Sequence, residues 1–160
     1  MVSEQKRVIE NKDQTYYWGV DCGSSAIKII VCDEQGNVLL RRKRKTLFPL
    51  QHHIKLALDD DGGFSPFESI TCQEKKQDER IGHGIKVKKN HRLAATGYGR
   101  HHIDYIDNTL TEIKAHFLGV KKQLNIDQPL TIIDIGGQDA KIIAADFDRV
   151  DRFTINRKCA

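Results

Sequence analysis

One pattern occurs twice in this chain: Val-Asp-Cys-Gly-Ser-Ser-Ala-Ile-Lys at residues 20–28 and Ile-Asp-Ile-Gly-Gly-Gln-Asp-Ala-Lys at residues 133–141. In both copies an apolar run ends in an aspartate, a turn containing glycine follows, and a second apolar run carries a lysine. Apolar runs joined by a short glycine turn are typical of β-hairpins. A single copy is most often an ordinary β-turn, but the repetition predicts two related hairpins.

The strands of the two hairpins belong to a larger set of predicted strands. Apolar runs bounded by turn residues predict strands at residues 16–21, 26–32, 38–40, 92–96, 130–135, 140–145 and 150–155. The run at 26–32 is nearly unbroken, which indicates a strand that is buried on both faces. The basic run at 41–45 is best explained as the solvated end of a strand.

The clearest predicted helix covers residues 111–124. Its apolar residues recur with the period of about 3.6 residues that marks one helix face: Ile113, Phe117, Val120 and Leu124. Thr111 is suited to cap the N-terminus of this helix. Proline and glycine interrupt residues 46–90, so we expect only one or two short helices there.

Composition and charge restrict the class of protein. The chain has 160 residues, of which 39% are hydrophobic and 30% charged, the balance of an ordinary globular domain. The net charge of +4 is modest, and no aromatic residues are interleaved with the basic run, so we expect no nucleic-acid partner. No stretch approaches the ~18 apolar residues of a membrane span, so we expect no membrane partner and a cytoplasmic location.

The two hairpins carry the residue types that the phosphates of a nucleotide require. A phosphate needs several backbone N–H donors at short range, and glycine lets the backbone approach closely. The aspartate beside each turn, Asp21 or Asp134, would repel a phosphate but can hold the Mg²⁺ ion that bridges phosphate oxygens. Paired phosphate hairpins across a cleft are the hallmark of the superfamily of acetate kinase, hexokinase, actin and heat-shock chaperones, which the chain therefore resembles.

Further sequence strings narrow this resemblance. In chain order they are Ala-Thr-Gly-Tyr-Gly-Arg at 95–100, Thr-Glu-Ile-Lys-Ala-His at 111–116, Ile-Ile-Asp-Ile-Gly-Gly-Gln-Asp-Ala-Lys at 132–141 and Asn-Arg-Lys-Cys-Ala at 156–160. Together they resemble the activator ATPases of 2-hydroxyacyl-CoA dehydratases and the related ATPase subunits of benzoyl-CoA reductases. The resemblance extends from about Trp18 to the last residue.

The resemblance implies an α/β protein with an actin-like (RNase H-like) ATPase fold, comprising the first lobe and the opening strands of the second. The polar residues 1–15 are expected to form a flexible arm, 16–125 the first lobe and 126–160 the start of the second. The family continues beyond its Lys-Cys pair into more of the second lobe and an adenosine-binding glycine motif. We therefore expect an N-terminal part of such a protein, one that alone hydrolyses ATP poorly or not at all.

The resemblance also implies roles for individual residues. A first loop for phosphate and metal would consist of Asp21, Gly23, Ser24, Ser25 and Lys28. A second loop would consist of Asp134, Gly136, Gly137, Gln138 and Asp139. Asp21, Asp134 and Glu112 would be the catalytic residues. Glu112 stands at the start of the predicted helix at 111–124, where related folds place a residue that orients the attacking water. A glutamate that only stabilises the helix N-terminus explains Glu112 equally well.

Cys159 matches the cysteine with which the family holds a [4Fe-4S] cluster shared by two subunits. The resemblance thus implies ATP, Mg²⁺ and a [4Fe-4S] cluster as cofactors, and a second copy of the chain as a partner. Two further partners are implied, a CoA-ester dehydratase or reductase and an electron donor such as ferredoxin or flavodoxin. Arg157 departs from the family, which usually has an aspartate before the Lys-Cys pair.

The implied function is an ATP-dependent iron–sulfur activator that hydrolyses ATP to drive low-potential electron transfer. Two alternatives remain open. One is an actin-like nucleotide-binding regulatory module without redox chemistry, and the other is a small-molecule kinase. A kinase would need a substrate base in the first lobe, and residues 46–90 offer no convincing candidate.

Overall fold

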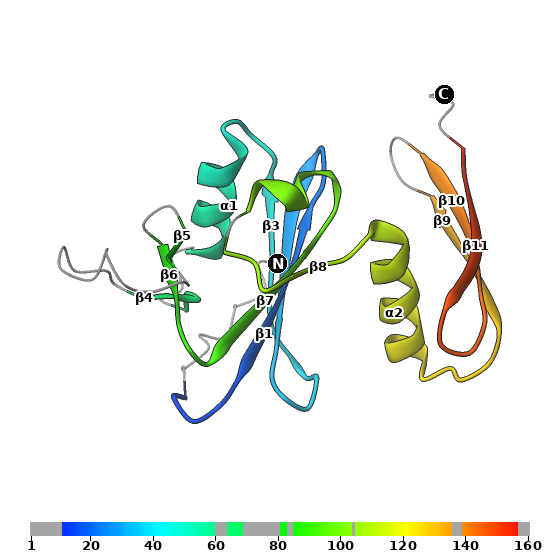
Figure 1. Ribbon diagram of the computed structural model, residues 1–160, viewed down its shortest axis with the longest axis horizontal. Helices are drawn as coiled ribbons and strands as arrows, with labels where there is room; N and C mark the ends of the chain where they lie inside the picture. Colours follow the sequence, from blue (N-terminus) through cyan, green and yellow to red (C-terminus); the bar gives the residue numbers. More distant parts are fainter. Residues whose placement is uncertain are drawn as a thin grey trace, which may run out of the picture. The chain divides into compact units, whose positions relative to one another are not determined.

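The computed structural model describes residues 11–59, 64–68, 81–82, 85–103, 105–135 and 139–156. The contacts divide the chain into two compact units, Met1–Thr109 and Leu110–Ala160. Figure 1 shows the sheets and helices of both units. The arm and lobe boundaries suggested by the sequence stay predictions, and most of the arm lies outside the described residues.

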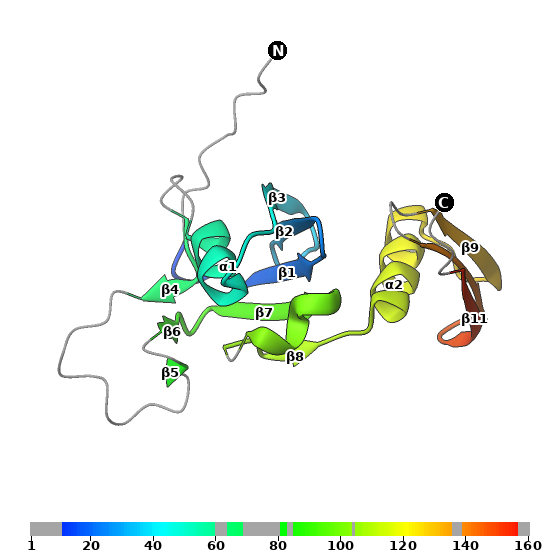
Figure 2. The same ribbon diagram turned by 90° about the horizontal axis from the view of Figure 1, so that it is seen from above.

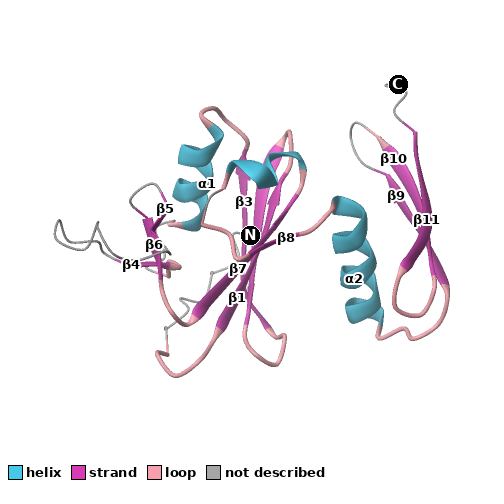
Figure 3. Ribbon diagram, viewed as in Figure 1, coloured by secondary structure: helices cyan, strands magenta, loops and turns pink. Residues whose placement is uncertain are grey.

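A five-stranded sheet forms the centre of the first unit. Its strands follow the order β3-β2-β1-β7-β8, in which β1 is antiparallel to β2 and parallel to β7. Their bounds are β1 Tyr16–Cys22, β2 Ala26–Cys32, β3 Val38–Lys45, β7 His91–Thr96 and β8 Asn108–Thr109. The strands predicted for this part of the chain are therefore confirmed (Figure 3). Because β1 and β7 are parallel, both strands end at the same edge of the sheet.

One face of this sheet carries the core. Side chains alternate between the faces of a strand, and the buried residues of β1 and β2 are Tyr16, Trp18, Val20, Cys22, Ile27, Ile29 and Val31. Helix α1 (Leu50–Leu58) contacts β2 and β3 and lies over this face (Figure 2). The helix buries its own apolar residues Ile54, Ala57 and Leu58 there.

The expectation that the strand at 26–32 is buried on both faces is wrong. Lys28 and Ile30 of β2 are exposed, and they alternate with the buried residues of the same strand. The physical reason is that β2 lies between two antiparallel neighbours, and antiparallel sheets commonly leave one face to the solvent. The apolar run therefore reflected β propensity as much as burial.

Residues 46–90 contain the short helix that was expected, namely α1. They also contain three short strands that the sequence did not predict: β4 Phe67–Glu68, β5 Ile81–Gly82 and β6 Ile85–Val87. These strands form a small sheet of order β4-β6-β5. A 3-10 helix, η1 (Tyr98–His102), follows β7.

The second unit consists of helix α2 (Glu112–Leu124) and a three-stranded antiparallel sheet of order β11-β10-β9. The strands are β9 Leu130–Ile135, β10 Ala140–Ala145 and β11 Val150–Asn156, in agreement with the predicted ranges. Helix α2 contacts β10 and β11, and the hydroxyl of Thr111 caps it by accepting a hydrogen bond from the Lys114 amide at 3.3 Å. The helix and its cap were thus predicted correctly.

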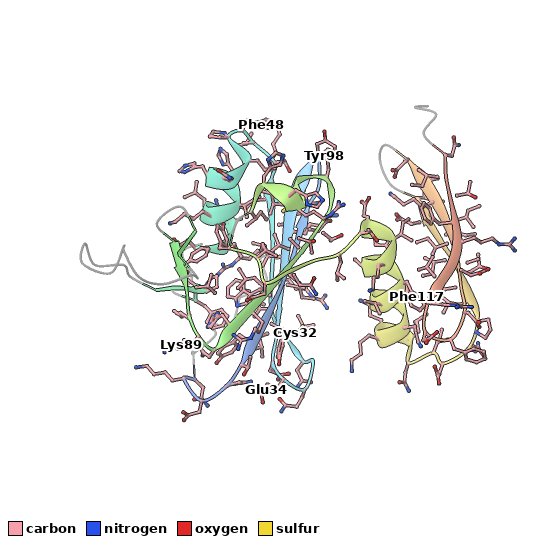
Figure 4. The ribbon with its side chains drawn as sticks, in the orientation of Figure 1. Cys32, Glu34, Phe48, Lys89, Tyr98 and Phe117 are labelled. Carbon is pink, nitrogen blue, oxygen red and sulfur yellow. The ribbon has the colours of Figure 1, made fainter. Side chains whose placement is uncertain are left out.

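The apolar face of α2 is shorter than the sequence suggested. Ile113 and Phe117 are buried, whereas Leu124 is 62% exposed in the last turn (Phe117 is labelled in Figure 4). No helix in the part of the chain that the structure describes is long and apolar enough to cross a membrane.

Arg42 ties β3 to the end of α1. Its guanidinium donates hydrogen bonds to the carbonyl oxygens of Ala57 at 3.3 Å, Leu58 at 2.8 Å and Phe64 at 3.2 Å. The last carbonyls of a helix have no partner within the helix, so a cation placed there satisfies them. Arg42 is therefore structural, while its neighbour Lys43 on the opposite face of β3 is exposed.

We predict that Arg42→Met lowers the free energy of unfolding by about 1–3 kcal/mol, because it leaves buried carbonyls without donors. Lys43→Met is the matched control and should change stability by less than about 0.5 kcal/mol. Urea denaturation followed by circular dichroism measures both. Equal effects of the two substitutions would contradict the structural role of Arg42.

Candidate functional site

The first hairpin places a carboxylate and an ammonium group opposite each other. Asp21 on β1 is the cross-strand partner of Lys28 on β2, and Lys28 Nζ donates to Asp21 Oδ2 at 2.9 Å. The Lys28 side chain is 60% exposed. An ion pair this exposed contributes little stability, so Lys28 can leave Asp21 for another anion at small cost.

Two buried oxygen atoms beside this pair have no hydrogen-bond partner among the described residues. They are Asp21 Oδ1 and Thr96 Oγ1. The parallel register of β1 and β7 sets Thr96 beside Asp21. Buried polar atoms are normally paired, and exceptions of this kind point to a missing water molecule or ion. The pair of oxygens thus fits a site for a hydrated cation.

The turn after β7 packs directly against the first hairpin. Gly97 has φ +84°, and a Cβ atom there would lie 2.7 Å from Asp21 Oδ1 and 2.7 Å from the carbonyl oxygen of Cys22. A Cβ atom on Gly99 would lie 3.0 Å from the Cβ atom of Cys22. This close approach explains the glycines of the Thr-Gly-Tyr-Gly-Arg string. Tyr98 between them is 86% exposed (Figure 4).

Hydrogen bonds within the hairpin and from Thr46 fix the loop of the first hairpin. The amide of Gly23 donates to the carbonyl of Ala26 at 3.1 Å, and the hydroxyl of Thr46 donates to the carbonyl of Gly23 at 2.7 Å. The Thr46 amide donates to the carbonyl of Ser25 at 3.1 Å. Ser24 and Ser25 lie exposed at the tip of this braced loop. The predicted phosphate-loop residues are therefore brought together with Asp21 and Lys28, while their role stays a prediction.

The second hairpin repeats the geometry of the first. Asp134 on β9 is the cross-strand partner of Lys141 on β10, seven positions apart like Asp21 and Lys28. Lys141 Nζ lies 3.5 Å from Asp134 Oδ2 and 2.5 Å from Asp139 Oδ1. The Lys141 side chain is only 5% exposed. The predicted residues Gly136, Gly137 and Gln138 lie outside the described residues, as does Cys159.

Helix α2 directs two side chains toward the second hairpin. Glu112 Oε2 lies 3.8 Å from Lys141 Nζ, and His116 Nδ1 lies 3.2 Å from Asp134 Oδ2. Residues four apart share one helix face, so the first turns of α2 present both groups together. The structure thus brings Glu112, Asp134 and Asp139 together around Lys141. Sequence reasoning noted Glu112 but missed His116, although the i, i+4 spacing was a usable signal.

Burial and neighbouring charges shift two pKa values in these hairpins. Burial lowers the pKa of Lys141, but the hydrogen bond to Asp139 and the charges of Glu112, Asp139 and Asp134 outweigh it, so the pKa is raised overall. Burial, together with the charge of Asp21, raises the pKa of the Cys22 thiol to about 12. The Cys22 thiol therefore stays protonated and unreactive at neutral pH.

The described residues contain no group of three or more His, Cys, Asp or Glu side chains arranged to hold a metal ion by themselves. A magnesium ion held here would therefore take part of its coordination from water and phosphate oxygens, as Mg²⁺ usually does. The buried oxygens of Asp21 and Thr96 fit such an ion.

The profile of the BadF/BadG/BcrA/BcrD ATPase family matches residues 18–160. The chain belongs to this family. The match covers both hairpins and the Thr-Gly-Tyr-Gly-Arg string, so the family membership rests on the whole site and not on one motif.

Two relatives illustrate the similarity. The uncharacterized protein YjiL of Escherichia coli (strain K12) is 34% identical over 148 residues, 91% of this chain and 48% of that protein. The (R)-2-hydroxyglutaryl-CoA dehydratase activating ATPase of Acidaminococcus fermentans is 28% identical over 148 residues, again 91% of this chain and 48% of that protein. This chain thus spans about half the length of the relatives it matches.

A solved structure shows the same fold. The activator of the 2-hydroxyisocaproyl-CoA dehydratase from Clostridium difficile, with bound ADPNP, superimposes with a TM-score of 0.63 and 27% identity. The match covers 91% of this chain and 47% of that one. The prediction of an α/β, actin-like ATPase fold is therefore confirmed.

We predict that Gly97→Ala destabilises the first unit by about 1–3 kcal/mol, because its backbone conformation is one that essentially only glycine adopts. Gly119→Ala is the control, since a Cβ atom on Gly119 meets nothing within 4 Å. That helix substitution should stabilise the second unit by about 0.5–1 kcal/mol. Thermal unfolding measures both, and a Gly97→Ala variant as stable as the wild type would contradict the close approach.

Proposed function

We propose that this chain binds Mg²⁺ and the phosphates of ATP through its two Asp–Lys hairpins. The observation that carries the proposal is the duplicated pair, Asp21 with Lys28 and Asp134 with Lys141, at the same cross-strand register. The ATPase family of the chain and the ADPNP bound to a solved relative support it.

Each group of residues has a distinct part in this proposal. The amides of residues 24–25 and 136–138 bind phosphate oxygens, and exposed Lys28 moves from Asp21 to a phosphate. Asp21 Oδ1 and Thr96 Oγ1, which are buried without partners among the described residues, hold the hydrated metal ion. Magnesium-bound ATP supplies the electrophilic phosphorus and the leaving group. Glu112 orients the attacking water, since it lies beside Asp134 and Asp139.

We further propose that the protein uses this ATPase activity as an iron–sulfur activator. ATP hydrolysis would drive low-potential electron transfer to a 2-hydroxyacyl-CoA dehydratase or a benzoyl-CoA reductase. Relatives that are named as dehydratase activators support the dehydratase partner. The [4Fe-4S] cluster at Cys159, the second copy that shares it, a ferredoxin or flavodoxin donor and a cytoplasmic location belong to the same proposal.

A binding experiment tests the nucleotide part of the proposal. Asp21→Asn and Asp134→Asn should each weaken Mg²⁺-dependent binding of ADPNP by about 10-fold or more, because each removes a carboxylate that orients the metal and its water. Isothermal titration calorimetry measures the affinity. Asp151→Asn, which changes an exposed carboxylate of β11, is the control and should bind as the wild type does. Unchanged affinity in both hairpin variants would overturn the proposal.

An iron analysis separates the activator from a nucleotide-binding module without redox chemistry. After anaerobic reconstitution, Cys159→Ala should lose its iron and its dimer, because a cluster shared by two subunits needs a thiolate from each. Cys32→Ala is the control and should keep both, since Cys32 lies half-buried at the end of β2 (Figure 4). A full complement of iron and sulfide in Cys159→Ala would refute the redox assignment.

A further inference from the structure

Lys141 is a buried charged residue of the second unit. Its side chain is 5% exposed, whereas its counterpart Lys28 in the first hairpin is 60% exposed. Lysine is almost never buried so completely unless its charge is compensated. The compensation comes from three elements, because Glu112 belongs to α2, Asp134 to β9 and Asp139 to the end of the hairpin turn before β10.

The three carboxylates surround one point in space. Their oxygens lie 2.5, 3.5 and 3.8 Å from Lys141 Nζ, so one ammonium ion faces all three negative charges. The other basic group at this cluster is His116, whose Nδ1 faces Asp134 at 3.2 Å. With Lys141 in place, its single positive charge offsets part of the negative charge of the three carboxylates, and its ammonium group fills the space between them.

We propose that Lys141 is a positioning residue whose ammonium ion holds Glu112, Asp134 and Asp139 in their working arrangement and keeps free divalent cations away from them. Divalent metal then reaches this hairpin only together with the phosphates of a nucleotide. The entry of metal together with a nucleotide rests on the proposed function. The role of Lys141 concerns the lysine and the three carboxylates alone, and it is tested without nucleotide.

The physical argument is one of charge. Three carboxylates that lose their shared cation repel one another, and like charges at this range favour either protonation or capture of another cation. Carboxylate oxygens are the ligands that Mn²⁺ and Mg²⁺ prefer, and metal bound only to the native state stabilises it by mass action. Removal of the ammonium group should therefore create a metal site where the wild type has none.

The test is a gain of metal binding. Lys141→Met keeps an apolar stem of similar size and removes the charged end of the side chain. In the absence of nucleotide, we expect this variant to bind Mn²⁺ at least about 10-fold more tightly than the wild type, as measured by electron paramagnetic resonance of the free ion. Lys141→Arg retains the charge and should behave as the wild type does. Lys122→Met removes the charge of an exposed lysine of α2 and controls for the loss of one positive charge.

A second substitution locates the gained site. Asp139→Asn added to Lys141→Met should abolish the gain, because it removes the carboxylate closest to the lysine. Thermal unfolding with and without Mn²⁺ stays informative if Lys141→Met is less stable than the wild type. Mn²⁺ should raise the unfolding temperature of Lys141→Met and not that of the wild type.

The possible outcomes are distinct. Lys141→Met with the Mn²⁺ affinity and thermal response of the wild type would overturn the role of Lys141, and so would an equal gain in Lys122→Met. Failure of the wild type to bind ADPNP with Mg²⁺ would instead refute the proposed function and leave the Mn²⁺ result to decide the role of Lys141.

Discussion

The backbone of Gly97 lies so close to the end of β1 that only a glycine fits there. The parallel pairing of β7 with β1 produces this approach, because it ends both strands at one edge and sets Thr96 beside Asp21. The approach buries one oxygen of each of these two residues. The metal site that we propose for the first hairpin depends on those two oxygens, and a side chain at position 97 would push the turn away from them.

The two hairpins share a register but differ in what covers them. The pair of Asp21 and Lys28 lies on a solvent-facing side of its sheet, where the lysine can move. Helix α2 covers the pair of Asp134 and Lys141 and adds Glu112 to it. One duplicated motif thus gives an exposed cation in the first unit and a buried cation in the second. The difference arises from helix packing and from Asp139, which stands where the first hairpin has Ala26.

Much of the local structure could be predicted from the sequence, because it depends on neighbours along the chain. Alternation of apolar residues and turn residues located the strands of both hairpins, and Thr111 marked the start of α2. The burial of Lys141 and the contact of His116 with Asp134 could not be predicted. Both depend on how α2 packs on its sheet, and a lysine in a strand looks the same whether a helix covers it or not.

Two further features that the sequence did not reveal, the exposed face of β2 and the packing of Gly97, have the same origin. The apolar run of β2 suggested burial on both faces, but only tertiary contacts decide which faces of a strand are covered. The role of Gly97 was also hidden, because the sequence showed a glycine-rich string without showing what it packs against. Family resemblance identified the string, and the structure supplied its physical reason.

Hydrogen exchange with and without ADPNP and Mg²⁺ tests the central claim most directly, because it reports on both hairpins in one experiment. If the two Asp–Lys hairpins bind the nucleotide phosphates, the backbone amides of residues 24–25 and of residues 136–138 should both exchange more slowly in the complex. Protection confined to one hairpin, or found only elsewhere in the chain, would contradict the account.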